Sequence, residues 1–341
     1  MHLLVGNPTA QSGKNAERIG RARALLDASH LPHRFLATLP AGETVAAVAA
    51  ATRDPAISVV IAMGGDGTFA EVAKGLLDSG RAEEVALAML PTGTANDQGK
   101  TFGLSSDPSE LEANVLVIRR GHETHLDVGD LTTFDDTGHV VGHERFFDSL
   151  GFGISPRVLA TRNEDRKIIE GIPFVREILR DHAVYAGALF RTFLSSYVED
   201  QKFDAVVVAD GETVEWRGLT DLVVKATRIY GGIWVFAPES RHDDGKFEVV
   251  PFVGKRDWLS KAMVHLDATG QLERDLAAVG VTHSRAVSAA EIDLTLTPHA
   301  GNPLPAAQID GEELAPLPGA RVLVKVAARA LRLIVPREHA G

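Results

Sequence analysis

Ile57-Ser58-Val59-Val60-Ile61-Ala62-Met63 runs directly into Gly64-Gly65-Asp66-Gly67-Thr68, and this stretch decides the fold of the first part of the chain. The apolar run is typical of a strand that is covered on both faces, and Thr68 to Leu77 has a helical pattern. Glycines in such a turn let the backbone approach a ligand closely, and the free N–H groups at the helix start favour phosphate. Asp66 suits a magnesium ion or its water shell rather than a bare phosphate.

The same alternation of strands and helices surrounds this stretch. We expect further strands at His2 to Val5, Phe35 to Thr38 and Val85 to Leu90, and further helices at Lys14 to Ala28 and Thr44 to Ala51. This order predicts an α/β domain with a mainly parallel, open sheet.

The pattern changes near residue 122, where short β segments separated by turn residues take over. They are Glu123 to Asp127, Phe146 to Leu150, Ala205 to Ala209, Asp221 to Lys225, Trp234 to Phe236, Lys246 to Phe252 and Glu291 to Thr297, and Arg321 to Val335 supplies one or two final strands. Such a series predicts an antiparallel β-sandwich. A long helix with an apolar stripe, over Val175 to Tyr197, interrupts it; the stripe suits core packing or lipid docking.

We therefore expect two domains: a nucleotide-binding α/β domain over 1–122 and a β-sandwich substrate domain over 123–324. The last segment, about 325–341, is a candidate to return to the first domain.

Composition narrows the class of protein. The 341 residues carry a formal net charge of −11 and no cysteine, which argues against a nucleic-acid partner and excludes disulfides and thiolate metal sites. No apolar run is long enough for a spanning helix and no signal peptide is recognisable, so we expect a cytoplasmic protein, with peripheral attachment to the membrane left open. His122, His125, His139 and His143 match no common zinc spacing and are expected to be solvated.

A second glycine-rich loop follows the next buried strand. Pro91-Thr92-Gly93-Thr94-Ala95-Asn96-Asp97 should open on the same edge of the sheet as the first loop, where open α/β sheets bind ligands. Thr92 and Thr94 offer hydroxyls to phosphate or adenine, whereas Asn96 and Asp97 could orient the loop or reach the substrate.

A third loop, Asn7-Pro8-Thr9-Ala10-Gln11-Ser12-Gly13-Lys14, follows the first strand. Lys14 could neutralise phosphate charge. The loop is not a Walker A motif, because Asn15 stands where that motif needs a hydroxyl.

In this order and spacing, the asparagine-proline loop, the Gly64 to Thr68 motif followed by Glu71, and the Pro91 to Asp97 motif resemble the diacylglycerol kinase catalytic domain. Bacterial lipid kinases and sphingosine and ceramide kinases share this domain. The resemblance extends over nearly the whole chain, through the segments Asp127-Val128-Gly129, Leu150-Gly151-Phe152-Gly153, Gly231-Gly232, Asp244-Gly245-Lys246-Phe247 and Asp310-Gly311-Glu312.

The resemblance implies a two-domain fold, like that of diacylglycerol and NAD kinases, with ATP and Mg²⁺ bound in the cleft. It places Asp310 as general base on a lipid hydroxyl with Glu312 nearby, and a structural magnesium on the carbonyls of Arg241 and Lys246 and the side chain of Asp244. Together the motifs and the resemblance predict a nucleotide site made of Asn7, Pro8, Ser12, Gly13, Lys14, Thr38, Gly64, Gly65, Asp66, Gly67, Thr68, Glu71, Thr92, Gly93, Thr94, Asn96 and Asp97.

The predicted function is therefore transfer of the ATP γ-phosphate to a lipid hydroxyl, nominally of diacylglycerol, in phospholipid metabolism at the membrane surface. Asp310-Gly311 by itself predicts only a turn. Family members often have Phe-Ala-Arg where Gln98-Gly99-Lys100 stands here, and Asp148 stands near a frequent asparagine. These departures keep two alternatives open: an NAD-kinase-like enzyme with a soluble acceptor, and a non-catalytic nucleotide-binding regulator. A homodimer is also left open.

Overall fold

The computed structural model describes residues 1–93, 96–153, 201–230, 235–237, 239–254, 257, 261 and 285–341, without the side chains of residues 11, 12 and 14. The predicted helix over Val175 to Tyr197 lies outside these residues, as does Thr94.

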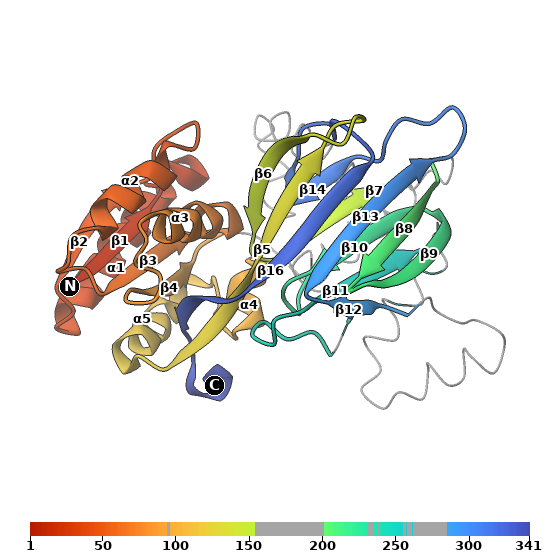
Figure 1. The fold of residues 1–341 in the computed structure, drawn as a ribbon. Helices are drawn as coiled ribbons and strands as arrows, with labels where there is room; N and C mark the ends of the chain where they lie inside the picture. Colours follow the sequence, from red (N-terminus) through yellow and green to blue (C-terminus); the bar gives the residue numbers. More distant parts are fainter. Residues whose placement is uncertain are drawn as a thin grey trace, which may run out of the picture.

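The first domain contains a parallel sheet whose apolar strands are covered on both faces (Figure 1). Its strands are β1 (His2–Gly6), β2 (His33–Ala37), β3 (Val59–Gly64) and β4 (Ala86–Pro91), in the spatial order β2-β1-β3-β4. Neighbouring strands in this order pair in parallel, so the ends of β1, β3 and β4 open on one edge. The mainly parallel α/β domain predicted from the sequence is confirmed.

Helices cover the two faces of this sheet. They are α1 (Lys14–Ala28), α2 (Glu43–Thr52), α3 (Asp66–Asp78) and α5 (Leu111–Arg120), with a short α4 (Asp97–Thr101) and single 3-10 turns η1 (Ala10–Gly13), η2 (Pro108–Glu110) and η3 (Arg337–His339). Apolar side chains of α1 and α5 pack with Leu4 and Ile61 on one face, and those of α2 and α3 pack with Val5 and Val60 on the other. Burial of both faces explains why these strands read as continuous apolar runs.

Two long strands connect the first domain to the second. They are β5 (Glu123–Phe134) and β16 (Arg321–Ile334), which pair antiparallel along most of their length. The end of β16 also pairs in parallel with β4, through Leu333 and Leu87. Figure 1 shows β16 running from the second domain back beside the first, where the C-terminus lies. Leu331, Leu333 and Val335 are therefore part of the first domain's core.

A β-bulge in β16 lies where these long strands pass between the domains. The register with β5 shifts between Ala327 and Leu331, and Arg329 has a positive φ of 54°. The buried carboxylate of Asp127 on β5 accepts the N–H of Arg329 at 2.6 Å and that of Gly245 at 2.6 Å. Asp127 thus satisfies the N–H of Arg329, which the bulge removes from the ladder, and also binds the N–H of Gly245 on another loop.

The second domain is a sandwich of two antiparallel layers. The first layer continues the sheet of the first domain with β13 (Glu291–Pro298), β8 (Phe203–Ala209) and β9 (Glu212–Leu219), and with β6 (Val140–Phe146) beside β5. The second has the order β12-β11-β10-β7-β14-β15 and consists of β12 (Val287–Ala289), β11 (Phe247–Phe252), β10 (Asp221–Lys225), β7 (Ser149–Gly153), β14 (Ala307–Ile309) and β15 (Glu312–Glu313). One apolar core lies between the layers, so the predicted antiparallel sandwich is confirmed.

Two predicted strands differ from the observed ones. Phe146 to Leu150 was expected as a single strand, but β6 ends at Phe146 and β7 begins at Ser149. The N–H groups of residues 147 to 149 turn instead toward the side chain of Asp310, which removes them from the ladder. Within the predicted strand Trp234 to Phe236, the described residues 235 and 236 are not in a strand. Over the described part of the chain, no helix is long and apolar enough to cross a membrane.

Candidate functional site

The Gly64 to Thr68 motif forms the sharp passage from β3 into α3. Gly65 is the extended residue before the helix, and Asp66 is its first residue. A Cβ added at Gly64 would lie 2.4 Å from the Thr68 side chain, so only glycine fits there. The helix start leaves backbone N–H groups free at the edge of the sheet, as phosphate binding requires.

The second loop touches the first through glycines. A Cβ added at Gly93 would lie 2.6 Å from the Cα of Gly65, and Thr92 donates its N–H to the carbonyl of Gly64 at 2.8 Å. Asn96 has a left-handed backbone, with φ 51°, and its side chain accepts the Gly93 N–H at 3.1 Å and donates to the Gly93 carbonyl at 2.5 Å. The amide of Asn96 thus closes the loop on itself, and the glycines bring the two loops together.

The asparagine-proline loop lies on the same edge, after β1. The side chain of Asn7 accepts the N–H of Thr9 at 3.0 Å and its hydroxyl at 2.8 Å, while Asn15 donates to the Asn7 carbonyl at 2.7 Å. Gly13 precedes α1 with φ 86°. Thr38 follows β2 and donates its N–H to Gly6 at 3.0 Å. Pro8 lies in the turn between Asn7 and η1. Together with the two glycine-rich loops, these residues show that the described loop residues of the predicted nucleotide site lie on one edge of the sheet. The side chains of Ser12 and Lys14 are outside the described part.

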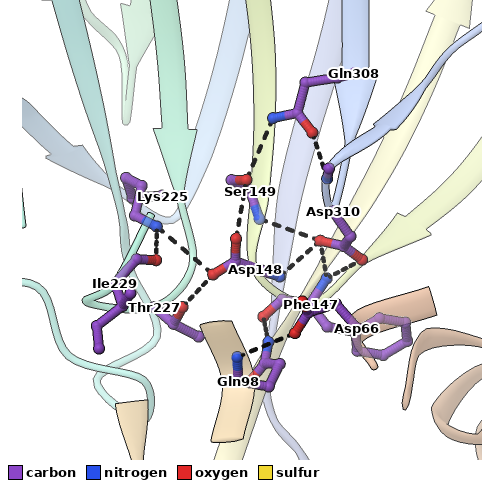
Figure 2. Close-up of polar contacts among 11 residues, drawn as sticks. Asp66, Gln98, Phe147, Asp148, Ser149, Lys225, Thr227, Ile229, Gln308 and Asp310 are labelled. Atoms are coloured by element: carbon purple, nitrogen blue, oxygen red, sulfur yellow. Dashed lines mark hydrogen bonds and ion pairs between the residues drawn. The ribbon is translucent and has the colours of Figure 1, made fainter. Parts of the chain in front are cut away.

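Asp310 lies in the tight turn between β14 and β15. Asp310 and Gly311 both have positive φ, of 50° and 81°, so the turn expected from an Asp-Gly pair is present. The carboxylate of Asp310 also accepts three backbone N–H groups, from Phe147 at 3.0 Å, Asp148 at 2.7 Å and Ser149 at 3.1 Å (Figure 2). Asp310 therefore forms the turn and also has its carboxylate held in a fixed position.

The two domains meet beside this turn, with Glu312 on one side and Glu71 on the other. A Cβ added at Gly67, in the first turn of α3, would lie 2.7 Å from Oε1 of Glu312. Burial, and then the nearby Glu312 carboxylate, raise the pKa of Glu71 from its ordinary value, against hydrogen bonding from Thr44. Glu312 of the second domain therefore reaches the helix that begins with Asp66.

Gln98 links the two loops to the turn that holds Asp310. Its N–H donates to Oδ1 of Asp66 at 3.3 Å, and its side chain donates to the carbonyl of Phe147 at 2.5 Å. Figure 2 shows Asp66, Gln98, Phe147 and Asp310 following one another in this order. The residue that departs from the family pattern therefore joins the two domains at the site.

Carboxyl groups dominate the electrostatics of the site. Burial raises the pKa of Asp66, Asp97 and Asp310, and the carboxylate of Asp148 raises each of them further. The pKa of Asp310 reaches about 7, although three backbone N–H groups lower it. Such shifts mean that the nearby cations compensate only part of the negative charge of these carboxyl groups.

This donor set fits a hard cation. Oδ1 of Asp97 and Oε1 of Gln98 are buried and have no hydrogen-bond partner within the described part of the chain, and oxygen atoms are the ligands that Mg²⁺ prefers. Among the described residues, no group of three or more acidic or histidine side chains could hold a metal by itself. Mg²⁺ is usually bound through one or two carboxylates together with water and substrate phosphates. Asp66 and Asp97 are the residues that would hold it.

The predicted structural magnesium site lies on the loop before β11. Asp244 is exposed and accepts the N–H of Lys246 at 3.1 Å, and Arg241 donates to Asp243 at 3.3 Å. The neighbouring Gly245 donates to Asp127, which connects this loop with the bulge of β16. Metal binding by Arg241, Asp244 and Lys246 stays a prediction.

Sequence reasoning missed the polar residues behind Asp310. Lys225, Thr227 and Gln308 are buried, and Figure 2 shows them around Asp148 and Ser149. One signal was available, because Lys225 directly follows the apolar residues Leu222, Val223 and Val224 of a predicted strand. A lysine in such a place is rarely buried without a partner.

The fold resembles that of solved diacylglycerol and NADH kinases. A solved diacylglycerol kinase from Bacillus anthracis str. Sterne superposes with a TM-score of 0.67 at 19% identity, covering 99% of this chain and 97% of that one. Yeast NADH kinase complexed with NADH superposes with a TM-score of 0.52 at 10% identity, covering 99% and 84%. At such identities these likenesses concern the fold alone.

The sequence comparison gives a match to a family model over the first part of the chain. Residues 1–131 match the family model described as the diacylglycerol kinase catalytic domain, so the resemblance inferred from the motifs is confirmed. A Pseudomonas putida protein named "probable lipid kinase YegS-like" is 30% identical over 193 residues, which is 56% of this chain and about half, 55%, of that protein. A Pseudomonas aeruginosa protein of the same name is 25% identical over 280 residues, covering 82% of this chain and 77% of that protein.

Proposed function

We propose that this protein is a kinase that transfers the γ-phosphate of ATP to a hydroxyl group of a lipid, with diacylglycerol as the nominal acceptor. The observation that supports this most is the position of Asp310. Its carboxylate is held by backbone N–H groups, and Gln98 connects that support to Asp66 at the start of α3. A carboxylate in this place lies beside the loops that suit nucleotide phosphates.

The chemistry needs positioning and charge neutralisation more than covalent catalysis. Asp310 takes the proton of the lipid hydroxyl, the hydroxyl oxygen forms a bond to the γ-phosphorus, and the bond from that phosphorus to the β,γ-bridging oxygen breaks to release ADP. A pKa near 7 leaves a large fraction of the Asp310 carboxyl ionised at neutral pH, as a general base requires. Magnesium, when bound, supplies positive charge to the phosphates. Asp66 and Asp97 would hold it.

The proposal includes where the enzyme acts. A lipid acceptor would be reached at the membrane surface by a cytoplasmic protein that attaches peripherally, as part of phospholipid metabolism. The relatives from Pseudomonas carry names that refer to lipid kinases, which supports a lipid rather than a soluble acceptor. The likeness to yeast NADH kinase keeps a nicotinamide nucleotide as the second candidate acceptor.

A phosphorylation assay with γ-labelled ATP tests this function. The purified protein is given liposomes that contain diacylglycerol, liposomes of extracted cell lipids, or NAD in solution, each with and without Mg²⁺. We expect label in a lipid product and dependence on Mg²⁺. Label in NAD alone would favour the second candidate, and ATP binding without any product would favour a regulatory protein.

Two variants test the role of Asp310 as the general base. Asp310→Asn should lower turnover by about 10²- to 10⁴-fold, the range in which general bases contribute, while ATP binding is largely kept. Glu313→Gln is the matched control, because Glu313 is exposed in the same hairpin. Unchanged turnover in Asp310→Asn would refute the role of Asp310 as base.

A further inference from the structure

A fully buried lysine lies behind the residues that hold Asp310. Lys225 ends β10, and its Nζ lies 3.6 Å from Oδ1 of Asp148, which is also buried. The ammonium group also donates to the carbonyl of Ile229 and lies 5.1 Å from the centre of the Tyr230 ring. A buried charge is tolerated only when it is paired and hydrogen-bonded, so Lys225 and Asp148 depend on each other.

The carboxylate of Asp148 is fixed on both of its oxygens. Thr227 donates its hydroxyl to Oδ1 at 2.5 Å, and Ser149 donates its hydroxyl to Oδ2 at 3.1 Å. The network continues, because Gln308 donates to the Ser149 hydroxyl at 3.2 Å and accepts the N–H of Gly311 at 2.6 Å. Figure 2 shows these side chains between Lys225 and the turn of Asp310.

The backbone of the same residue contacts Asp310. The N–H of Asp148 donates to the Asp310 carboxylate at 2.7 Å, the shortest of the contacts from residues 147 to 149. Asp148 therefore binds Lys225 through its side chain and Asp310 through its main chain. A movement of the Asp148 backbone toward or away from Lys225 would also move the N–H groups that hold Asp310.

We propose that Lys225, through its buried ion pair with Asp148, is a positioning residue that holds Asp310 in place for phosphoryl transfer. This inference rests on the proposed function for the role of Asp310, whereas the positioning itself can be measured without any substrate. Lys225 does not touch the reacting atoms. It acts by fixing the turn 147–149, to which the carboxylate of Asp310 is hydrogen-bonded.

Removing the lysine charge should disturb this turn selectively. Lys225→Met keeps an unbranched side chain of similar length but leaves the Asp148 carboxylate buried without its cation. The turn would then shift toward water or toward other donors. A misplacement of about 1 Å at a reacting group can lower the rate by about 10²-fold, so we expect a fall of that order in kcat.

Amide hydrogen exchange of the full-length protein gives a readout that needs no activity. In Lys225→Met, the N–H groups of residues 147 to 149 should exchange at least about tenfold faster than in the wild type, while β1 and β3 keep their protection. The control is Lys325→Met, which removes an exposed lysine of the same domain from its 2.8 Å pair with Glu291. That variant should match the wild type in exchange and in kcat.

Two further variants keep the test decisive if Lys225→Met does not fold. Asp148→Asn should also speed exchange of the turn, since it leaves Lys225 without its carboxylate. The double variant Asp148→Asn with Lys225→Met buries no unpaired charge, and we expect it to recover most of the protection and of kcat. The inference would be overturned if residues 147 to 149 exchanged at the wild-type rate in both single variants. It would also be overturned if they exchanged as fast in the double variant as in either single variant. If the wild type phosphorylates no acceptor, the proposed function fails, while the exchange rates still decide whether Lys225 positions Asp310.

Discussion

The contact between the two glycine-rich loops can be tested with a single methyl group. Gly93 and Gly65 face each other, and neither is needed for a positive φ, so the space between them is what excludes a side chain. In Gly93→Ala the new Cβ would lie 2.6 Å from the Cα of Gly65 and 3.0 Å from Oδ1 of Asn96. The first of these neighbours is backbone, which cannot rotate away as a flexible side chain can.

The geometry sets the size of the effect. Ordinary contact begins at 3.4 Å, so the two loops must separate by about 0.8 Å. Overpacking of this kind costs about 1–3 kcal/mol of the free energy of unfolding. A shift of about 1 Å between groups that bind one nucleotide can lower kcat/KM by about 10²-fold. We therefore expect Gly93→Ala to fold, with a lower melting temperature and a large loss of activity.

Thermal unfolding and steady-state kinetics would measure both effects. The matched control is Gly20→Ala on the exposed side of α1, where an added Cβ meets nothing within 4 Å and φ is not positive. In that control the free energy of unfolding should increase by about 0.5–1 kcal/mol, because alanine has the higher helix propensity, and the activity should be kept. If Gly93→Ala binds and turns over ATP as the wild type does, the close approach of the two loops is wrong.

Three other predictions concern buried carboxyl groups. Because the pKa of Asp310 is about 7, kcat/KM should rise as the pH increases through 7, and a pH–rate profile without an inflection there would argue against this base. Raised pKa values of Asp66 and Asp97 mean that the folded state holds protons that the unfolded state has lost, so the ligand-free protein should lose stability between about pH 4 and pH 8 in melting experiments. Mg²⁺ with ATP should offset that loss at pH 8. Asp127→Ala removes the carboxylate that accepts the part-buried N–H groups of Arg329 and Gly245 and should cost about 1–3 kcal/mol in denaturant unfolding; a cost near zero would mean that water replaces the carboxylate.

Much of the architecture follows from local sequence patterns. The helix expected over Lys14 to Ala28 has those bounds in the structure, and the strand expected over Asp221 to Lys225 does as well. Both rest on short-range periodicity, which is set by the backbone geometry of a helix or strand. The break between β6 and β7 could not be predicted this way, because Phe147 and Asp148 leave the ladder to bind Asp310, 163 and 162 positions away.

The sequence by itself determined the class of fold, the alternation of strands and helices at the start of the first domain, and the two glycine-rich loops. Apolar runs, helical spacing and glycines between a strand and a helix are local properties, and the physics of backbone and burial acts on them locally. Only the tertiary structure decided what surrounds Asp310. It joined Gln98 to Phe147 across the two domains and placed Lys225 against Asp148, because the elements and turns that carry these residues are brought together only when both sheets have formed. The ion pair between Lys225 and Asp148 is buried only in the complete fold, so no local pattern along the chain could have specified the pair.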